Sequence, residues 1–421
     1  MARPTPAAPD PAASVRAPSG FQIEHQCPQC GAPACLEETD RLYACPYCRV
    51  KSFLLTRDVF RYVLPPRTPS RELIHIPYWR FKGVLLFTTT GGNDHKFVDV
   101  TQCAAAAAGA PQTLGVRAQA MKLKFAAPES AGSFVPPGVS FAAMVKGVQQ
   151  RFGRGLTRSI LCQAHLGESV GLIYAPFYVA RGRLHDAVLE APVGTPADAA
   201  ASEGLKRGRQ EWKVSFVAAL CPDCGWDLEG ERDALVLLCR NCSSAWTPSG
   251  DRLTRVDGDC LPDPDAEVHL PFWQIRCELE GLDLRGCAEL GRIATLPAAP
   301  GRAPGVAFWA PAFKVRPQVY LRLAVGLTLG QPQDKLTPGL PPAGHHPVGL
   351  PVEEACESLK AVLAAFYTPR RALPDILPGL AIRATHFRLA YLPFRADVHD
   401  YVQPLTGLAV GRSLLAQSRN L

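Results

Sequence analysis

Eight of the fifteen cysteines occur in four C-x-x-C pairs, a pattern that is typical of metal binding. Two pairs lie within residues 27–48 and two within residues 221–242, and fourteen residues separate the pairs in each set. Two such turns facing each other place four sulfurs in a tetrahedron around one ion. The sequence therefore predicts two closed structural metal sites, with the ligands Cys27, Cys30, Cys45 and Cys48 in one and Cys221, Cys224, Cys239 and Cys242 in the other.

Zinc is the metal that these donors favour, with one Zn²⁺ in each site and no position left for a reactive water. Iron in the same four-sulfur shell is the alternative, because tetrahedral sulfur suits both metals. A redox disulfide is disfavoured, since thioredoxin-type C-x-x-C motifs occur singly. The other seven cysteines are scattered, and we expect buried structural thiols at Cys35, Cys103, Cys162, Cys260, Cys277, Cys287 and Cys356.

The similarity between the two cysteine sets continues into the residues that follow them, at the same offset of 194 positions. H-I-P-Y-W at 75–79 corresponds to H-L-P-F-W at 269–273. Related phrases, Y-A-P-F at 174–177 and Y-L-P-F at 391–394, come later in each half. A register held over some fifty residues indicates an internal tandem duplication.

The repeated histidines and tryptophans have two possible roles, structural and functional. No acidic residue recurs beside His75 and His269, so we expect structural histidines on strands rather than ligands or bases. Trp79 and Trp273 are expected in the core, because indole rings bury a large apolar area. The alternative is an exposed aromatic platform that stacks on bases or on a peptide.

The elements that must position these residues are mostly strands. We expect a hairpin of strands 73–81 and 84–90, a second hairpin around Arg181 and Gly182, and a strand over 319–329. Helical patterns cover 141–152 and 352–367. The predicted fold class is α+β and β-rich, with two homologous units that each contain a four-cysteine zinc ribbon and a mainly antiparallel β domain with one helix.

The predicted boundaries follow from the Pro/Ala/Gly-rich stretches. They are a disordered tail (1–20), zinc ribbon 1 (21–56), β/α unit 1 (70–192), a linker (193–212), zinc ribbon 2 (215–250) and β/α unit 2 (262–415). His345 and His346 fall in a Pro/Gly-rich loop, where we expect them to be exposed to solvent.

Composition indicates the cellular compartment and limits the classes of binding partner. The chain has no apolar run long enough to span a membrane and no secretory signal, so we expect cytoplasmic localisation and reduced thiols. The formal charge of +7 is uneven, because residues 1–210 carry 24 Lys and Arg against 15 Asp and Glu. Only this first half could offer a basic face to nucleic acid or to an anionic membrane surface.

Residues 21–56 and 215–247 resemble zinc ribbons. The combination of a ribbon with recurrent Pro-aromatic strands is similar to uncharacterised bacterial zinc-ribbon proteins, some of which accompany membrane-stress systems of the phage-shock kind. The resemblance implies a bacterial zinc-binding protein, and it brings no catalytic residues with it.

Searches for catalytic patterns find no P-loop, no G-x-S-x-G, no H-E-x-x-H and no paired-carboxylate cluster. We therefore expect a non-catalytic binding or scaffold protein that engages a protein partner. The alternatives are a nucleic-acid-binding protein that uses the basic first half, and a peripheral membrane-associated stress-response component.

Overall fold

The structure is a computed structural model that describes residues 20–68, 72–105, 109–115, 121–156, 158–250, 252–294, 306–341 and 344–417. The predicted disordered tail lies outside these ranges except for its last residue. Strands make up 42% of the structure and helices 18%, so the chain is β-rich, as the sequence predicts.

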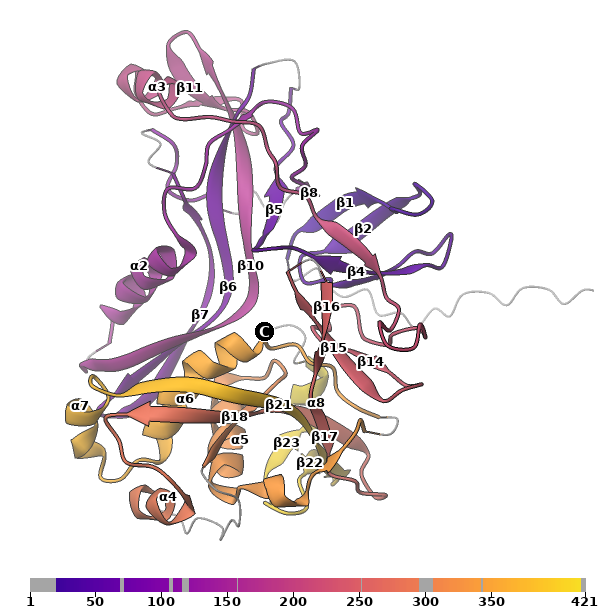
Figure 1. Ribbon diagram of the computed structural model, residues 1–421. Helices are drawn as coiled ribbons and strands as arrows, with labels where there is room; N and C mark the ends of the chain where they lie inside the picture. Colours follow the sequence, from indigo (N-terminus) through magenta and orange to yellow (C-terminus); the bar gives the residue numbers. More distant parts are fainter. Residues whose placement is uncertain are drawn as a thin grey trace, which may run out of the picture.

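The first half is built on a ten-stranded sheet whose central strands, β6 and β10, run side by side through most of its height (Figure 1). Helix α2 (Phe141–Gly153) packs against β6, and α3 (Pro196–Glu203) lies beside β11. The strands of this sheet are β1 (Gln22–Gln26), β2 (Pro33–Glu37), β5 (Phe60–Val63), β6 (Ile74–Thr89), β7 (Gly92–Cys103), β8 (Lys122–Phe125), β9 (Ser133–Phe134), β10 (Ile160–Ala180), β11 (Arg183–Asp186) and β12 (Ala191–Val193).

The predicted hairpin around Lys82 and Gly83 is wrong, because β6 continues through both residues as one strand of 16 residues. Gly83 has a packing role there. A Cβ at this position would lie 2.3 Å from the carbonyl oxygen of Leu166 on β10. The true turn comes at Thr90 and Gly91, where β6 reverses into β7.

The predicted hairpin around Arg181 and Gly182 is confirmed. These residues join β10 to β11 with φ values of +51° and +65°. Two consecutive positive φ angles are those of a tight type I′ turn, whose twist matches that of the flanking antiparallel strands.

The second half contains a seven-stranded sheet in the lower part of Figure 1. Its strands are β17 (Gly258–Cys260), β18 (Val268–Glu280), β19 (Ala307–Pro311), β20 (Thr337–Pro338), β21 (Ala381–Ala396), β22 (Asp400–Val402) and β23 (Ala409–Gly411). The helices of this half are α4 (Cys287–Ile293), α5 (Pro317–Gly330), α6 (Val352–Phe366), α7 (Leu373–Ile376) and α8 (Arg412–Gln417), with 3₁₀ turns η1 (Pro332–Lys335) and η2 (Arg370–Ala372).

The expectation of one helix per unit is therefore wrong for the second unit. The predicted strand over 319–329 lies within α5, which begins with Pro317 at its first turn. The buried residues of α5 include Val319, Tyr320, Leu323 and Leu327, which is a helical spacing. A helix that is apolar on several faces resembles a buried strand in sequence, because neither shows a clear alternation.

The central strand pairs of the two halves share one register. Pro77 on β6 lies opposite Tyr174 on β10, and Pro271 on β18 lies opposite Tyr391 on β21. The backbone bonds around them also correspond: Ala104 N–H donates to Pro77 O at 2.8 Å, and Ala312 N–H donates to Pro271 O at 3.0 Å.

The two repeated tryptophans each fix the start of a helix. The indole N–H of Trp79 donates to Val139 O at 2.6 Å, just before α2, and that of Trp273 donates to Leu350 O at 2.8 Å, just before α6. Both rings are buried, which confirms the expected core role and excludes an exposed aromatic platform at these positions.

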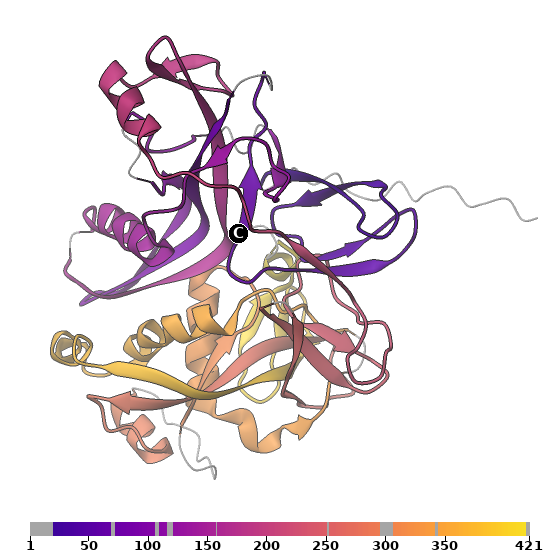
Figure 2. The same cartoon turned by 45° about the horizontal axis from the view of Figure 1, so that its top comes forward.

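Helix α6 joins the two halves. It lies between the sheets (Figures 1 and 2) and packs on β10 and β6 as well as on α5. One apolar core therefore includes Val84 and Leu166 of the first half together with the core of the second. A 2.7 Å ion pair between His165 and Glu357 lies at the same interface.

Candidate metal centres and an adjacent basic cleft

Both cysteine sets lie on short hairpins that the sequence builds in the same way. In the first ribbon one cysteine turn connects β1 to β2. The other connects β3 (Leu42–Ala44) to β4 (Lys51–Leu55). The second ribbon uses β13 (Ser215–Ala218), β14 (Leu237–Cys239), β15 (Ser244–Ser249) and β16 (Arg252–Val256). In three of the turns the first cysteine donates its N–H to the carbonyl five residues on, as Cys27 does to Ala32 at 2.8 Å.

The eight predicted ligands are brought together in two groups of four. In each group all ligand atoms lie within 4.8 Å of one another. The Sγ–Sγ distance is 3.8 Å for Cys27 and Cys48 and 3.6 Å for Cys221 and Cys242. A tetrahedron with metal–sulfur bonds of about 2.3 Å has edges of about 3.8 Å. Each group therefore fits one tetrahedral metal ion, with all four positions filled by protein sulfur.

The surroundings favour the thiolate form at some of the cysteines in each site and oppose it at others. The backbone N–H of Cys48 and the hydroxyl of Tyr43 lower the pKa of Cys45 to about 6 despite its burial. In the second site burial raises the pKa of Cys239 to about 12, with hydrogen bonds to neighbouring thiols adding to the effect. Four negative sulfurs repel one another, so binding of a cation is what allows all four to ionise.

The two ribbons are joined by a shared sheet. Strand β13, which leads into the second cysteine set, pairs antiparallel with β4 of the first ribbon. Asp40 of the first ribbon forms an ion pair with Arg232 of the second, whose carbonyl accepts the N–H of Leu42 at 2.8 Å. Because β4 starts where β13 ends, the turn at Cys45–Cys48 and the turn at Cys221–Cys224 lie at the same end of this sheet.

That end of the sheet carries exposed apolar side chains. Tyr47 (67% exposed) and Val50 lie at one turn, and Trp226 (58% exposed) and Leu220 lie at the other. Ala219 N–H donates to Lys51 O at 3.0 Å, just beyond the last residue pair of the β4–β13 ladder. Val50 and Leu220, the next residues of each segment, follow directly at this end of the sheet. We call these four residues the knuckle patch. The patch was not predicted from the sequence, although an aromatic residue lies within one C-x-x-C turn and two residues after the other.

In the described part of the chain, no carboxylate forms a hydrogen bond or an ion pair with either repeated histidine. Burial lowers the pKa of His75 to about 4, its Nε2 lies 3.0 Å from Ala131 O, and its ring stacks on Phe134 at 4.4 Å. Burial also lowers the pKa of His269, although the charge of Asp263 acts in the opposite direction. Both side chains are buried, as expected of structural histidines.

Two other predictions about side chains need correction. His345 and His346 are half-buried rather than exposed, because Arg240 donates to His345 Nδ1 at 2.9 Å and His346 N–H donates to His269 O. Among the seven remaining cysteines only Cys103 and Cys260 are buried, while Cys35 is exposed and the other four are half-buried. Of the five that are not buried, Cys287 and Cys356 lie on helices and the other three on strands, and sequence position alone does not reveal how far neighbouring elements cover them.

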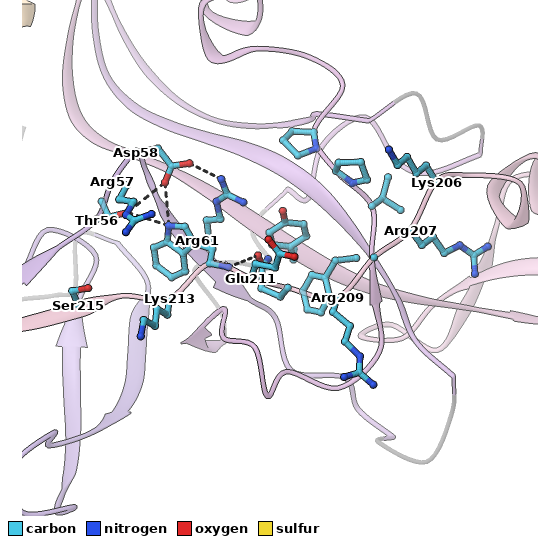
Figure 3. Close-up of a pocket in the computed structure, with 18 of the residues that line it drawn as sticks. Thr56, Arg57, Asp58, Arg61, Lys206, Arg207, Arg209, Glu211, Lys213 and Ser215 are labelled. Atoms are coloured by element: carbon cyan, nitrogen blue, oxygen red, sulfur yellow. Dashed lines mark hydrogen bonds and ion pairs between the residues drawn. The ribbon is translucent and has the colours of Figure 1, made fainter. Parts of the chain in front are cut away.

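A cleft of about 1030 Å³ opens beside the first ribbon, between β5, β9 and residues 206–213 (Figure 3). Six basic and two acidic side chains line it. Three of the basic ones come from the predicted linker (193–212), and Lys213 directly follows it. This segment is not a free connection, because Gly208 exchanges two backbone hydrogen bonds with Phe134. The indole of Trp212 donates to Thr56 Oγ1 and Asp58 Oδ1, each at 3.0 Å. The signal that could have revealed the cleft is the basic run K-R-G-R-Q-E-W-K at 206–213.

In the part of the chain that the structure describes, none of the helices combines the length and the apolar character that a membrane crossing requires. Comparisons of the chain with protein-family profiles, with curated proteins and with solved structures find no match.

Proposed function

We propose that this chain is a non-catalytic binding protein, in which two zinc ions hold a pair of ribbons that dock a protein partner through the knuckle patch. The observation that carries the proposal is the position of Tyr47 and Trp226 on the metal-binding turns themselves. Exposed apolar side chains that gather in one patch mark contact sites, unlike single ones such as Phe97, and aromatic residues are frequent at the centres of protein interfaces.

Metal binding explains how the turns that carry the knuckle patch keep one conformation. Each C-x-x-C turn is only a few residues long, and the four metal–sulfur bonds of a site fix its two turns far more rigidly than their own hydrogen bonds do. Charged residues such as Asp223 and Lys51 surround the patch, which is the arrangement of an apolar centre with a polar rim. The eight thiolates require a reducing compartment, and the cytoplasm is the one we propose.

Site-specific photo-crosslinking would test the partner. Replacing Trp226 or Tyr47 with benzoylphenylalanine should capture one defined protein in cells that make this chain. The control places the same probe at Phe97, which is exposed on β7 away from the ribbons. Equal products at position 97, or none at 226 and 47, would contradict the proposal. So would a substrate-dependent activity that one point mutation abolishes while metal content and fold stay intact.

We also propose that the two halves are copies of one unit. The support is the set of corresponding backbone bonds around Pro77 and Pro271 and the two indole bonds of Trp79 and Trp273. Replacing either tryptophan with phenylalanine removes the same hydrogen bond. If the two positions are equivalent, the two variants lose similar amounts of stability, about 1–2 kcal/mol each.

A further inference from the structure

We infer that the basic cleft lined by residues 206–213 binds single-stranded nucleic acid. This site is separate from the knuckle patch and does not depend on the protein-partner proposal.

The cleft has a fixed wall. The extended segment 206–213 is held to β9 by the two Gly208 bonds, of 2.9 and 3.0 Å, and to the loop before β5 by the indole of Trp212. A wall that is already in position loses little conformational entropy when a ligand binds. Its cationic side chains are therefore presented without a prior folding step.

The charges of the cleft suit a chain of anions. Arg57, Arg61, Lys206, Arg207, Arg209 and Lys213 line it, against Asp58 and Glu211. Asp58 is paired with Arg61 at 2.5 Å, so that Glu211 is the main acidic group facing the remaining cations. Figure 3 shows Arg57 and Lys213 at one end of the cleft, Lys206 and Arg207 at the other, and Arg61 and Arg209 between them. Cations spread along a path match successive phosphates better than they match one small anion.

Buried polar side chains brace the cleft wall. Gln210 is 6% exposed, and its side-chain oxygen accepts the N–H of Trp212 at 3.1 Å. Gln210 and Arg61 also interact with the side chain of Tyr174, which lines the same cleft. These contacts hold the basic segment in the geometry that it presents to a ligand.

Aromatic residues distinguish nucleic acid from an acidic peptide. Trp212 in the lining is half-buried, whereas Tyr174 and Phe134 are buried at 2% and 4% exposed, so that Trp212 supplies the ring on which a base can pack. A positively charged groove with aromatic rings is the combination that binds single strands, whose bases are free to pack against the rings. A duplex presents a convex backbone with its bases already stacked, and it does not enter a concave cleft in this way.

Fluorescence anisotropy with a labelled oligothymidine of about fifteen nucleotides, a length sufficient for a short groove, tests the inference on the full metal-loaded chain. Replacing both Arg209 and Lys213 with glutamate should weaken binding at least about tenfold. With glutamine at both positions, the slope of log K against log salt should fall by about 1.4, or 0.7 for each phosphate contact. Lys96→Glu with Lys146→Glu is the matched control, since both residues are exposed in the same half but lie outside the cleft.

A gain of function guards against a folding defect. Glu211→Lys removes the main acidic group of the cleft and should tighten binding several-fold. The affinities of a duplex of equal length and of a polyglutamate of similar charge are measured as competitors of the single strand. Tighter binding of either competitor overturns the inference, as does an equal loss of affinity in the cleft and control variants. Tightest binding of the single strand, with the opposite effects of the two cleft changes, supports it.

Discussion

At the scale of single residues, the metal-binding turns share a backbone conformation at a position where their residue types differ. The residue after the second cysteine of every C-x-x-C pair has a positive φ: Gly31 and Gly225 at +73°, Arg49 at +62° and Ser243 at +53°. Glycine adopts this left-handed conformation without strain, but a side chain raises its energy. The strain at Arg49 and Ser243 follows from the need to aim both sulfurs at one ion.

Arg49→Gly and Ser243→Gly should therefore each stabilise the protein, by about 0.5–1 kcal/mol after the added flexibility of the unfolded chain is subtracted. Thermal unfolding of the metal-loaded chain measures the effect. Arg252→Gly is the control, because this exposed residue lies within β16, where glycine should cost about 0.5–1 kcal/mol. A fall in stability for both turn variants would contradict the argument.

Glu354 is an acidic residue at the contact between the halves whose ionisation is opposed by burial. Burial raises its pKa to about 7, and its Oε2 accepts the N–H of Gly167 on β10 at 2.6 Å. His165, Lys314 and Glu357 are the charged groups that face it. Because its folded pKa lies above its ordinary value of 4.5, ionisation destabilises the fold as pH rises from about 4.5 through 7.

Glu354→Gln should remove that penalty. In chemical denaturation, the free energy of unfolding of the variant should equal that of the parent below about pH 4.5 and exceed it by up to about 3 kcal/mol at pH 8.

Glu357→Gln is the informative control. Burial of His165 opposes its protonation, but the Glu357 ion pair outweighs this and raises the pKa of His165, so that stabilisation is present at low pH and is lost as pH rises through the folded pKa. This control should lose stability in acid, and equal pH profiles for both variants would contradict the assignment.

At the scale of elements, β6 is long because a glycine lets β10 approach it closely. Gly83 faces the backbone of Leu166 and Gly167, where β10 has a register shift. Gly83→Ala should therefore cost about 1–3 kcal/mol, because backbone rather than a flexible side chain must move. Gly147→Ala on α2 is the matched control. No heavy atom lies within 4 Å of the added Cβ there, and alanine should stabilise the helix by about 0.5–1 kcal/mol. Unfolding midpoints that shift in the same direction would contradict this explanation.

At the scale of the whole molecule, the metal sites and the rest of the fold are mechanically connected. Strands β1 and β2 of the first ribbon extend the large sheet through β8, while β4 pairs with β13 of the second ribbon. Arg80, buried at 1% exposed, ties the carboxylate of Glu38 in the first ribbon to β6 at 3.0 Å. Loss of metal at one site should therefore loosen the neighbouring ribbon as well as its own.

Elemental analysis of the isolated chain should find two zinc equivalents, and strong chelation should lower its unfolding temperature. Cys30→Ser and Cys224→Ser should each reduce the content to about one equivalent, because three sulfurs leave the tetrahedral shell incomplete. Cys35→Ser, an exposed thiol outside both groups, should change neither metal content nor stability. Iron, or a single equivalent in the parent chain, would contradict the assignment.

The amino-acid sequence by itself determined the parts of this protein that depend on local spacing. The eight ligands follow from C-x-x-C turns, the β10–β11 turn follows from Arg181-Gly182, and the core tryptophans follow from a repeated phrase. These features depend on the few residues around them, so short-range chemistry is enough to identify them.

Only the tertiary structure decided what distant residues do together. Helix α5 has the sequence pattern of a buried strand because its neighbours bury several of its faces. Gly83 was predicted in a turn because the strand that requires a glycine there, β10, is distant in the sequence. The knuckle patch requires β4 and β13 to pair across some 160 residues, and the basic cleft requires residues 206–213 to dock on β9. Each depends on which surfaces meet, and that is set by the packing free energy of the whole chain rather than by any local pattern.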